Sequence, residues 1–250
     1  DFNTMVGVSS GRKMTSGNQN TSSGVNSMES TTTGGCNTAM GMSALTANTT
    51  GATNTALGHQ SLAAVTTGSG NVAVGFRSGF ANQTSSNNVS VGQDSLRCNT
   101  GSNNTALGRN ALENNTTADD NTAVGTGSLQ TNTTGHSNVA IGNCALYTNT
   151  EGDTNTAVGH HALKLNTTAA DNTGVGRNAL CTTTTGCVNT ALGSSAMQSN
   201  TTGDNNVAIG GSTLFNNTTA DNNTAVGTNA MITNTTGHSN VALGISALQS

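Results

Sequence analysis

The feature that most constrains this chain is an asparagine that recurs at a fixed interval along its whole length. Every interval is 17 residues except the one between Asn88 and Asn104, which is 16. Self-similarity at a short fixed period is typical of architectures in which each repeat stacks on the next. We therefore interpret residues 1–250 as a single continuous repeat array, whose fifteen copies begin at Asn3, Asn20, Asn37, Asn54, Asn71, Asn88, Asn104, Asn121, Asn138, Asn155, Asn172, Asn189, Asn206, Asn223 and Asn240.

One copy, residues 121–137, reads NTAVGTGSLQTNTTGHS, and we number its positions 1 to 17 from the asparagine. Position 5 is Gly in every copy, and position 9 is Leu or Met except where Gly11 and Gly79 stand. The apolar runs are too short for an amphipathic helix, and Thr, Val and Ile favour strands. The repeat therefore predicts an all-β fold, a parallel β-solenoid (β-roll) with one 17-residue repeat per coil, about fifteen coils and two short strands in each coil.

Three positions of the repeat predict how the coil is built. Gly at position 5 predicts a corner that a side chain would block, and Asn at position 1 predicts an amide ladder along the stack. Positions 2 and 4 should share one strand face and position 3 the other. Because position 3 is nearly always Ala, we expect both faces to be buried, one of them against a partner chain. The alternative is that Ala is only small and tolerated.

Composition limits the core and the partners. With four Phe, one Tyr and no Trp, the core must be thin, since aromatic residues normally dominate burial. A formal charge of −4 and seven scattered Lys and Arg give no electrostatic footprint for nucleic acid or anionic lipid. No apolar stretch is long enough for a membrane-spanning helix, so we expect no membrane insertion. A thin core also favours association with further copies, because little apolar surface offsets the backbone entropy.

Two short runs resemble a known family. NVAIG at 138–142 and at 206–210 looks like the head repeats of YadA-like trimeric autotransporter adhesins. The longer unit, NTAVG followed by AL and NTTG, is similar to repeat arrays of phage tail fibres and bacterial surface fibres. The resemblance implies a trimer of parallel β-rolls with one repeat per coil.

Asn-x-Thr sequons recur at position 12 of the repeat. In a secreted eukaryotic protein they would be N-glycosylation sites on exposed loops. The alternative is turn chemistry, because Asn and Thr are favoured in turns without any sugar, and closely spaced coils leave little width for glycans. The candidate acceptors are Asn48, Asn82, Asn115, Asn132, Asn166, Asn200, Asn217 and Asn234.

The remaining chemistry-bearing residues predict few sites. Of five Cys, only Cys181 and Cys187 lie near enough in sequence to form a disulfide within one coil, and two free thiols are the alternative. The His residues, among them the adjacent His160 and His161, do not gather with acids or Cys at ligand spacing. Acids recur at positions 16 and 17, but the glycine-rich calcium-binding nonapeptide is missing. We predict no catalytic residues, no metal site and no cofactor.

Together these patterns predict a structural protein and not an enzyme. We expect an extracellular fibre or adhesin segment at a cell or virion surface, a stiff scaffold that displays repeated polar loops. Its partner would be itself, as a trimer or an end-to-end filament, with a host surface or glycan as a further partner. The alternative is a binding module for a regular surface, ice or polysaccharide, through ranks of Thr at positions 2, 13 and 14.

Overall fold

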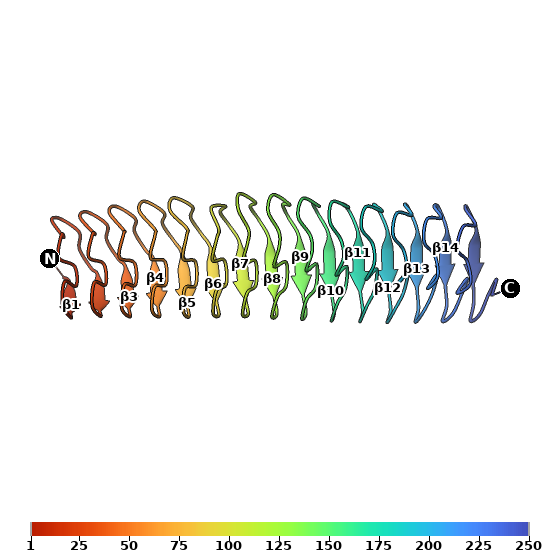
Figure 1. Ribbon diagram of the computed structural model, residues 1–250, viewed down its shortest axis with the longest axis horizontal. Helices are drawn as coiled ribbons and strands as arrows, with labels where there is room; N and C mark the ends of the chain where they lie inside the picture. The colour runs from red at the N-terminus through yellow and green to blue at the C-terminus, as the bar shows by residue number, and fades with distance from the viewer. Residues whose placement is uncertain (1, 250) are drawn as a thin grey trace. The chain divides into compact units, whose positions relative to one another are not determined.

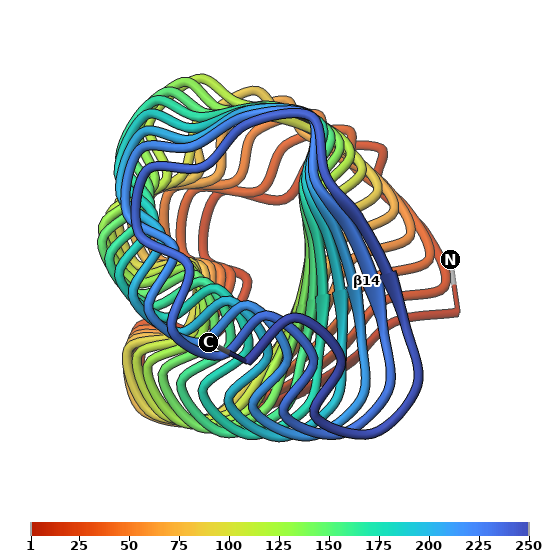
Figure 2. The ribbon, with the colours of Figure 1, turned by 90° about the vertical axis from the view of Figure 1, so that its right-hand side faces the viewer.

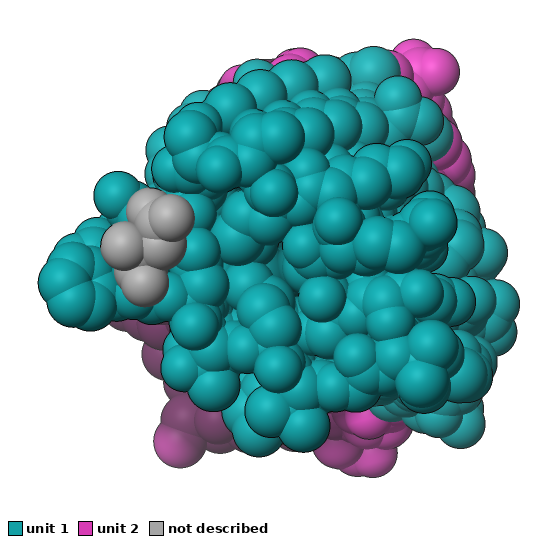
Figure 3. Space-filling view, turned by 90° about the vertical axis from the view of Figure 1, so that its left-hand side faces the viewer, with its two compact units in different colours: residues 1–121 teal, residues 122–250 magenta. Residues whose placement is uncertain are grey.

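The computed structural model describes residues 2–249 and is all-β, a parallel β-solenoid with one strand in each coil. It forms two compact units, residues 1–121 and 122–250 (Figure 3). Each strand has three residues and starts directly after the position-1 Asn. The strands of the first unit are β1 (Thr4–Val6), β2 (Thr21–Ser23), β3 (Thr38–Met40), β4 (Thr55–Leu57), β5 (Val72–Val74), β6 (Val89–Val91) and β7 (Thr105–Leu107). Those of the second are β8 (Thr122–Val124), β9 (Val139–Ile141), β10 (Thr156–Val158), β11 (Thr173–Val175), β12 (Thr190–Leu192), β13 (Val207–Ile209), β14 (Thr224–Val226) and β15 (Val241–Leu243).

Within each unit, every strand pairs in parallel with its sequence neighbours and in the register of the repeat (Figure 1). In β10 and β11, for example, Ala157 lies opposite Gly174 and Val158 opposite Val175. The 16-residue step does not disturb this register, since Val89 still pairs with Thr105. The predicted stacking of equivalent residues, coil after coil, is confirmed.

The second predicted strand of each coil is absent from the described residues, and turns take its place. Positions 7, 9 and 17 adopt left-handed backbone angles, as in Asn178 (φ 58°), Leu180 (φ 51°) and Asp171 (φ 59°). A chain that alternates in this way cannot keep the extended angles of a strand. Figure 2 shows the result: the strand forms one side of the coil, as at β14, and turns form the other sides.

The turn at position 9 explains the only two glycines found there. Gly11 and Gly79 both have φ of 60°, a conformation that costs glycine nothing. The Leu residues at the same position, such as Leu146 at φ 49°, are fully buried. An L-residue loses about 1 kcal/mol or more in this region, so burial of the Leu side chain must hold the backbone there.

Within the chain only one of the two strand faces is fully buried, and it is the face that carries position 3. The position-3 Ala points into the coil, where Ala140, Ala157 and Ala191 are fully buried. Positions 2 and 4 point outward and remain partly exposed, as Ile141 does at 40 %. The narrow interior therefore explains why position 3 is nearly always Ala, and this residue needs no partner chain to explain it.

The predicted Asn ladder at position 1 is confirmed. The backbone N–H of Asn155 donates to the Oδ1 of Asn138 (2.9 Å), and the Nδ2 of Asn155 donates to the carbonyl of Ala169 (2.8 Å). The same bonds recur in both units, for instance between Asn37 and Asn20 (2.9 Å). Each buried amide is thereby satisfied, which buried polar groups require.

The predicted glycine corner at position 5 is also confirmed. Gly142 has a φ of 132°, and a Cβ at this residue would lie 2.5 Å from the carbonyl oxygen of Gly159 in the next coil. The backbone N–H of Gly142 donates to the carbonyl of Val124 (2.7 Å). Close approach of two backbones and a positive φ both exclude larger residues.

Candidate functional site

The outward face of the sheet carries an aliphatic rank and no charge. Position 2 is Thr or Val, and position 4 is aliphatic in all strands but β2. Exposed position-4 side chains include Met40 (50 %), Ile141 (40 %) and Ile209 (38 %). In the first unit the rank is widened by apolar residues at position 6, among them Met42 and Phe76. Apolar side chains in a contiguous exposed band often mark an interaction surface.

The sequon asparagines lie inside the coil and not on exposed loops. All of them are fully or almost fully buried except the half-buried Asn234. The Nδ2 of Asn166 donates to the Oδ1 of Asn149 (2.7 Å) and to the carbonyl of Ala169 (3.0 Å). A sugar would attach to this same nitrogen, so the folded coil leaves it no room. The geometry favours turn chemistry for Asn48, Asn82, Asn115, Asn132, Asn166, Asn200, Asn217 and Asn234.

This second Asn ladder is broken where position 12 is not Asn. Thr183 takes the place of Asn in the coil that follows Asn166. There the Oδ1 of Asn166 and the Oγ1 of Thr183 are buried without a hydrogen-bond partner. Val65 breaks the ladder in the first unit and leaves the Oδ1 of Asn48 without a partner in the same way.

The Thr residues of the NTT turns form two parallel ranks. At position 13 each hydroxyl donates to the position-13 carbonyl of the next coil, as Thr167 does to Thr184 (3.0 Å) and Thr184 to Thr201 (3.2 Å). At position 14 the side chains are exposed, for example Thr168 and Thr185. The position-13 rank thus stabilises the turn, whereas the position-14 rank faces outward.

Position 16 holds side chains that accept one hydrogen bond from the preceding coil. The Oδ1 of Asp204 accepts from the N–H of Cys187 (2.7 Å), and the Sγ of Cys187 accepts from the N–H of Ala170 (3.4 Å). Ser69 and His238 occupy the same place in other coils. Acids recur at position 16 because any side chain that accepts a hydrogen bond can fill this role. The mixture of Ser, Asp and His at position 16 already indicated this in the sequence.

All five cysteines carry free thiols, Cys181 and Cys187 included. The proposed disulfide between these two is therefore not formed in this structure. Cys181 is half-buried, and burial raises the pKa of its thiol, while the nearby Lys164 acts in the opposite direction.

Charged residues at positions 7 and 10 of the first unit form a mixed network. Arg97 bonds Glu113 (Nη2–Oε1, 2.8 Å), and Arg77 lies 3.3 Å from the carboxylate of Asp94. Arg12 and Glu29 form a further pair. The pKa of the Arg97 guanidinium is raised, first of all by its hydrogen bond to Glu113. Contacts between these residues show that positions 7 and 10 lie side by side in one coil and in adjacent coils.

The side chains of the two adjacent histidines lie together. The rings of His160 and His161 are 3.7 Å apart between centroids and tilted by 32°. The pKa of the His161 imidazole is lowered by burial, then by the charges of His160 and Lys164. Over residues 2–249, no cluster of three His, Cys, Asp or Glu could hold a metal ion.

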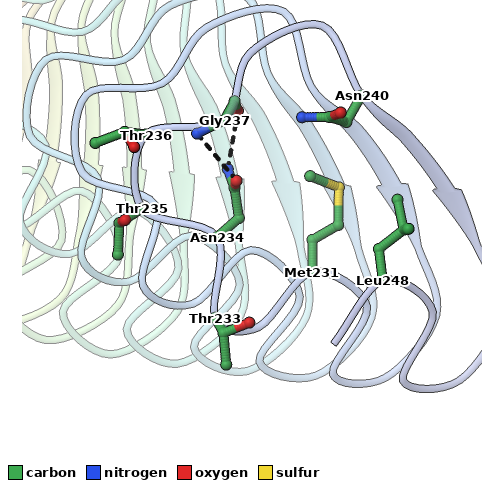
Figure 4. Close-up of a pocket in the computed structure, with 8 residues that line it drawn as sticks. All are labelled: Met231, Thr233, Asn234, Thr235, Thr236, Gly237, Asn240 and Leu248. Carbon is green, nitrogen blue, oxygen red and sulfur yellow. Dashed lines mark hydrogen bonds between the residues drawn. The ribbon is translucent and has the colours of Figure 1, made fainter. Parts of the chain in front are cut away.

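One pocket lies at the last coil of the second unit. It is lined by the buried Met231, the exposed Leu248 and the polar Asn234, Gly237 and Asn240 (Figure 4). Asn234 and Gly237 exchange two hydrogen bonds of 3.1 Å, as at the same turn in other coils. The pocket is the interior of a coil that no further coil of the described residues covers, and it has no chemistry of its own.

Comparison with protein families and with curated proteins finds no match for this sequence. Nor do residues 2–249 contain a helix that could cross a membrane.

Proposed function

We propose that this chain is a structural segment of an extracellular fibre or adhesin, which displays polar loops and assembles with further copies of itself. In this proposal it acts at a cell or virion surface and catalyses no reaction. The resemblance of NTAVG, AL and NTTG to surface-fibre repeats supports this assignment. So does the fold, since a β-solenoid presents the same few side chains at each coil.

The single observation that carries the proposal is the uncharged, partly exposed aliphatic rank on the outer face of the sheet. Aliphatic side chains such as Leu192 (37 %) and Ile209 (38 %) keep a third or more of their surface in water. Neighbouring Thr and Val at position 2 bring no charge to the same face. Burying such a face gains about 25 cal/mol for each Å² of apolar area.

A second copy is the partner that best fits this face. An identical sheet offers the same aliphatic rank, and a two-fold interface buries the same patch on both subunits. One unit alone presents a small patch, because eight strands about 4.8 Å apart and about 10 Å long cover only about 400 Å². A stable interface needs about 800 Å² on each partner. The face of one unit therefore supplies about half of the area that a stable interface needs.

The experiment is to place charge on the outer face and measure the oligomeric state. Val158→Lys with Val175→Lys puts two ammonium groups on adjacent strands of the second unit. We expect the unchanged chain to be oligomeric by mass photometry, and this variant to be monomeric with an unchanged circular dichroism spectrum. Buried charge without a partner is strongly unfavourable, which is the physical reason.

The matched control is Thr168→Lys with Thr185→Lys, two exposed position-14 residues in the same coils. This control should assemble as the unchanged chain does. A monomeric unchanged chain at micromolar concentration would exclude self-association, and equal loss in both variants would assign assembly to another surface.

A second candidate function is binding to ice or to an ordered polysaccharide. The observation in its favour is the exposed position-14 rank, in which Thr168, Thr185 and Thr202 follow one another at coil spacing. Hydroxyls at position 13 are already used within the stack, which leaves this outer rank as the binding surface. A thermal-hysteresis assay tests ice binding directly, and freezing without hysteresis at high protein concentration would eliminate it.

A further inference from the structure

The charges of the second unit are separated by repeat position. Its five acids, Glu151, Asp153, Asp171, Asp204 and Asp221, all lie at positions 14, 16 and 17. Its two permanent cations, Lys164 and Arg177, lie at positions 10 and 6, and His160 and His161 lie beside them at positions 6 and 7. We call these four residues, His160, His161, Lys164 and Arg177, the cationic patch.

The repeat geometry brings the members of the patch together. In the first unit, positions 7 and 10 of one coil are in contact, as Asn110 Nδ2 and Glu113 Oε2 are (2.7 Å). Position-6 side chains of adjacent coils are also in contact, as the rings of His59 and Phe76 are (5.4 Å). By repeat position, His161 and Lys164 correspond to the first of these pairs, and His160 and Arg177 correspond to the second. Direct electrostatic effects of His160 and Lys164 on His161 agree with this placement.

Cations at positions 7 and 10 are paired in the first unit but not in the described residues of the second. In the first unit Arg12, Arg77 and Arg97 each lie within 4.0 Å of a carboxylate, whereas Arg109 at position 6 is exposed. In the described part of the second unit, no carboxylate lies within ion-pairing distance of Lys164 or Arg177. His160 and Arg177 are exposed, and His161 and Lys164 are half-exposed. The patch thus holds accessible positive charge that none of the residues 2–249 neutralises through an ion pair.

We propose that the cationic patch binds the carboxylate or sulfate groups of an acidic polysaccharide. Lys and Arg bind such groups through charge-assisted hydrogen bonds, which are stronger than neutral ones. Tyr147, at position 10 of the preceding coil, is half-exposed and offers an aromatic surface for the ring carbons of a sugar. This binding goes beyond the scaffold role and does not depend on self-association.

Other anionic partners fit the patch less well. Nucleic-acid binding draws its affinity from many neutralised phosphates, and recognition of anionic lipid takes clusters of four to eight Lys or Arg. The patch has two permanent cations in a chain of net charge −4. A polysaccharide that crosses several coils needs only a few charges, because neutral hydroxyls of the surrounding Thr and Ser and amides of Asn complete the contacts.

Binding should strengthen as the pH falls, because protonation of His161 adds positive charge to the patch. The groups that face this histidine and His160 are Lys164 on the same coil, Cys144 and Tyr147 on the preceding coil, and Arg177 and Cys181 on the following coil. None of these is an acid, so protonation of the imidazoles adds only positive charge to the patch. Burial is the first cause of the lowered pKa of His161, and bound anions would offset the second, the repulsion from His160 and Lys164.

The test measures binding of the full chain to immobilised polysaccharides by biolayer interferometry at low salt. Dextran sulfate and polygalacturonate are the anionic probes and dextran is the neutral one. We expect binding to both anionic probes but not to dextran, weakening in 0.5 M NaCl through screening. Lys164→Gln with Arg177→Gln should lower the affinity about tenfold. His160→Gln with His161→Gln should remove the gain in affinity between pH 7.5 and 5.5.

The matched control is Arg109→Gln, which removes an exposed cation at position 6 in the first unit. It should keep the affinity within about twofold. Equal loss in this control and in the Lys164 and Arg177 variant would reduce the binding to overall charge and overturn the proposal. So would equal binding to dextran, or tighter binding to a single-stranded oligonucleotide or to phosphatidylserine vesicles. Mass photometry of the same variants separates this result from any failure of self-association.

Discussion

Replacing Thr183 by Asn should repair the second Asn ladder and stabilise the second unit. In its present state the ladder leaves the Oδ1 of Asn166 buried without a donor. An Asn at 183 would donate from Nδ2 to that oxygen and would offer its own Oδ1 to Asn200. The site can hold an Asn side chain, because neighbouring coils carry Asn at the same buried position.

The magnitude follows from the bonds gained. Two new hydrogen bonds at about 1 kcal/mol each give a stabilisation of about 2 kcal/mol. Because a repeat array opens locally, the effect should be read at the coil concerned. The backbone N–H of Thr184 donates to Thr201 across this junction (3.0 Å). Its hydrogen exchange should slow about 30-fold, since about 1.4 kcal/mol corresponds to a factor of ten.

Thr185→Asn is the control, because Thr185 is exposed at position 14 and such changes stay within about 0.5 kcal/mol. Val65→Asn repeats the test independently in the first unit, where it should supply the donor that Asn48 lacks. If Thr183→Asn exchanged no more slowly than the control, the assignment of the unpaired oxygen as a break in the ladder would be wrong.

Three further predictions follow from backbone angle, pKa and burial. In urea unfolding, Leu146→Ala should lower the free energy of unfolding by about 2–5 kcal/mol. Leu146→Gly should lower it by no more than that, because Ala at this positive φ loses about 1 kcal/mol that Gly does not. Ala157→Gly, in a strand, should instead be destabilising by about 0.5–1 kcal/mol. Because the pKa of His161 is lowered in the folded chain, the unfolded chain binds a proton at this histidine at a higher pH than the folded chain does. The free energy of unfolding should therefore drop between pH 7.5 and 5.5, and it should drop less in His161→Gln. Cys181, whose thiol pKa is raised by burial, should react with iodoacetamide at pH 8 more slowly than the exposed Cys36, and an equal rate would contradict its burial.

The sequence was sufficient for the coil and its register, because both depend on period alone. Asn at position 1 and Gly at position 5 recur without exception, and each has one backbone role that a stack can repeat. The structure confirms both roles, in the Asn155 ladder and at the Gly142 corner.

The sequence was not sufficient for the direction of the side chains. Alternation along a strand shows that positions 2 and 4 share a face, but not which face looks inward. Size would have been the better guide, because only small residues (Ala, Ser or Gly) stand opposite Leu146 and its equivalents in so narrow a coil. The prediction of a second strand was wrong because no sequence pattern indicates that Leu at position 9 adopts a left-handed backbone angle. Only Gly11 and Gly79, which replace this Leu, indicated a turn there.

The sequons and the cationic patch show the same limit for binding sites. A sequon gives only the order of residues. The direction of the Asn side chain depends on its hydrogen bond to the carbonyl of the small residue at position 15, such as Ala169. The patch could not be recognised in one dimension, because Lys164 and Arg177 are 13 residues apart and meet only when coils stack.

The hydrogen bonds of each interior coil join it only to its immediate neighbours, at sequence separations near one period. Asn172, for example, accepts from the N–H of Asn189 (2.9 Å) and donates to Gly186 (2.8 Å). Unequal recombination between near-identical repeats would therefore lengthen or shorten a unit by whole periods. Each remaining residue would still find a hydrogen-bond partner of the same type in the next coil. Length in such a chain can evolve separately from stability, and a variable copy number among natural alleles is the expected genetic outcome.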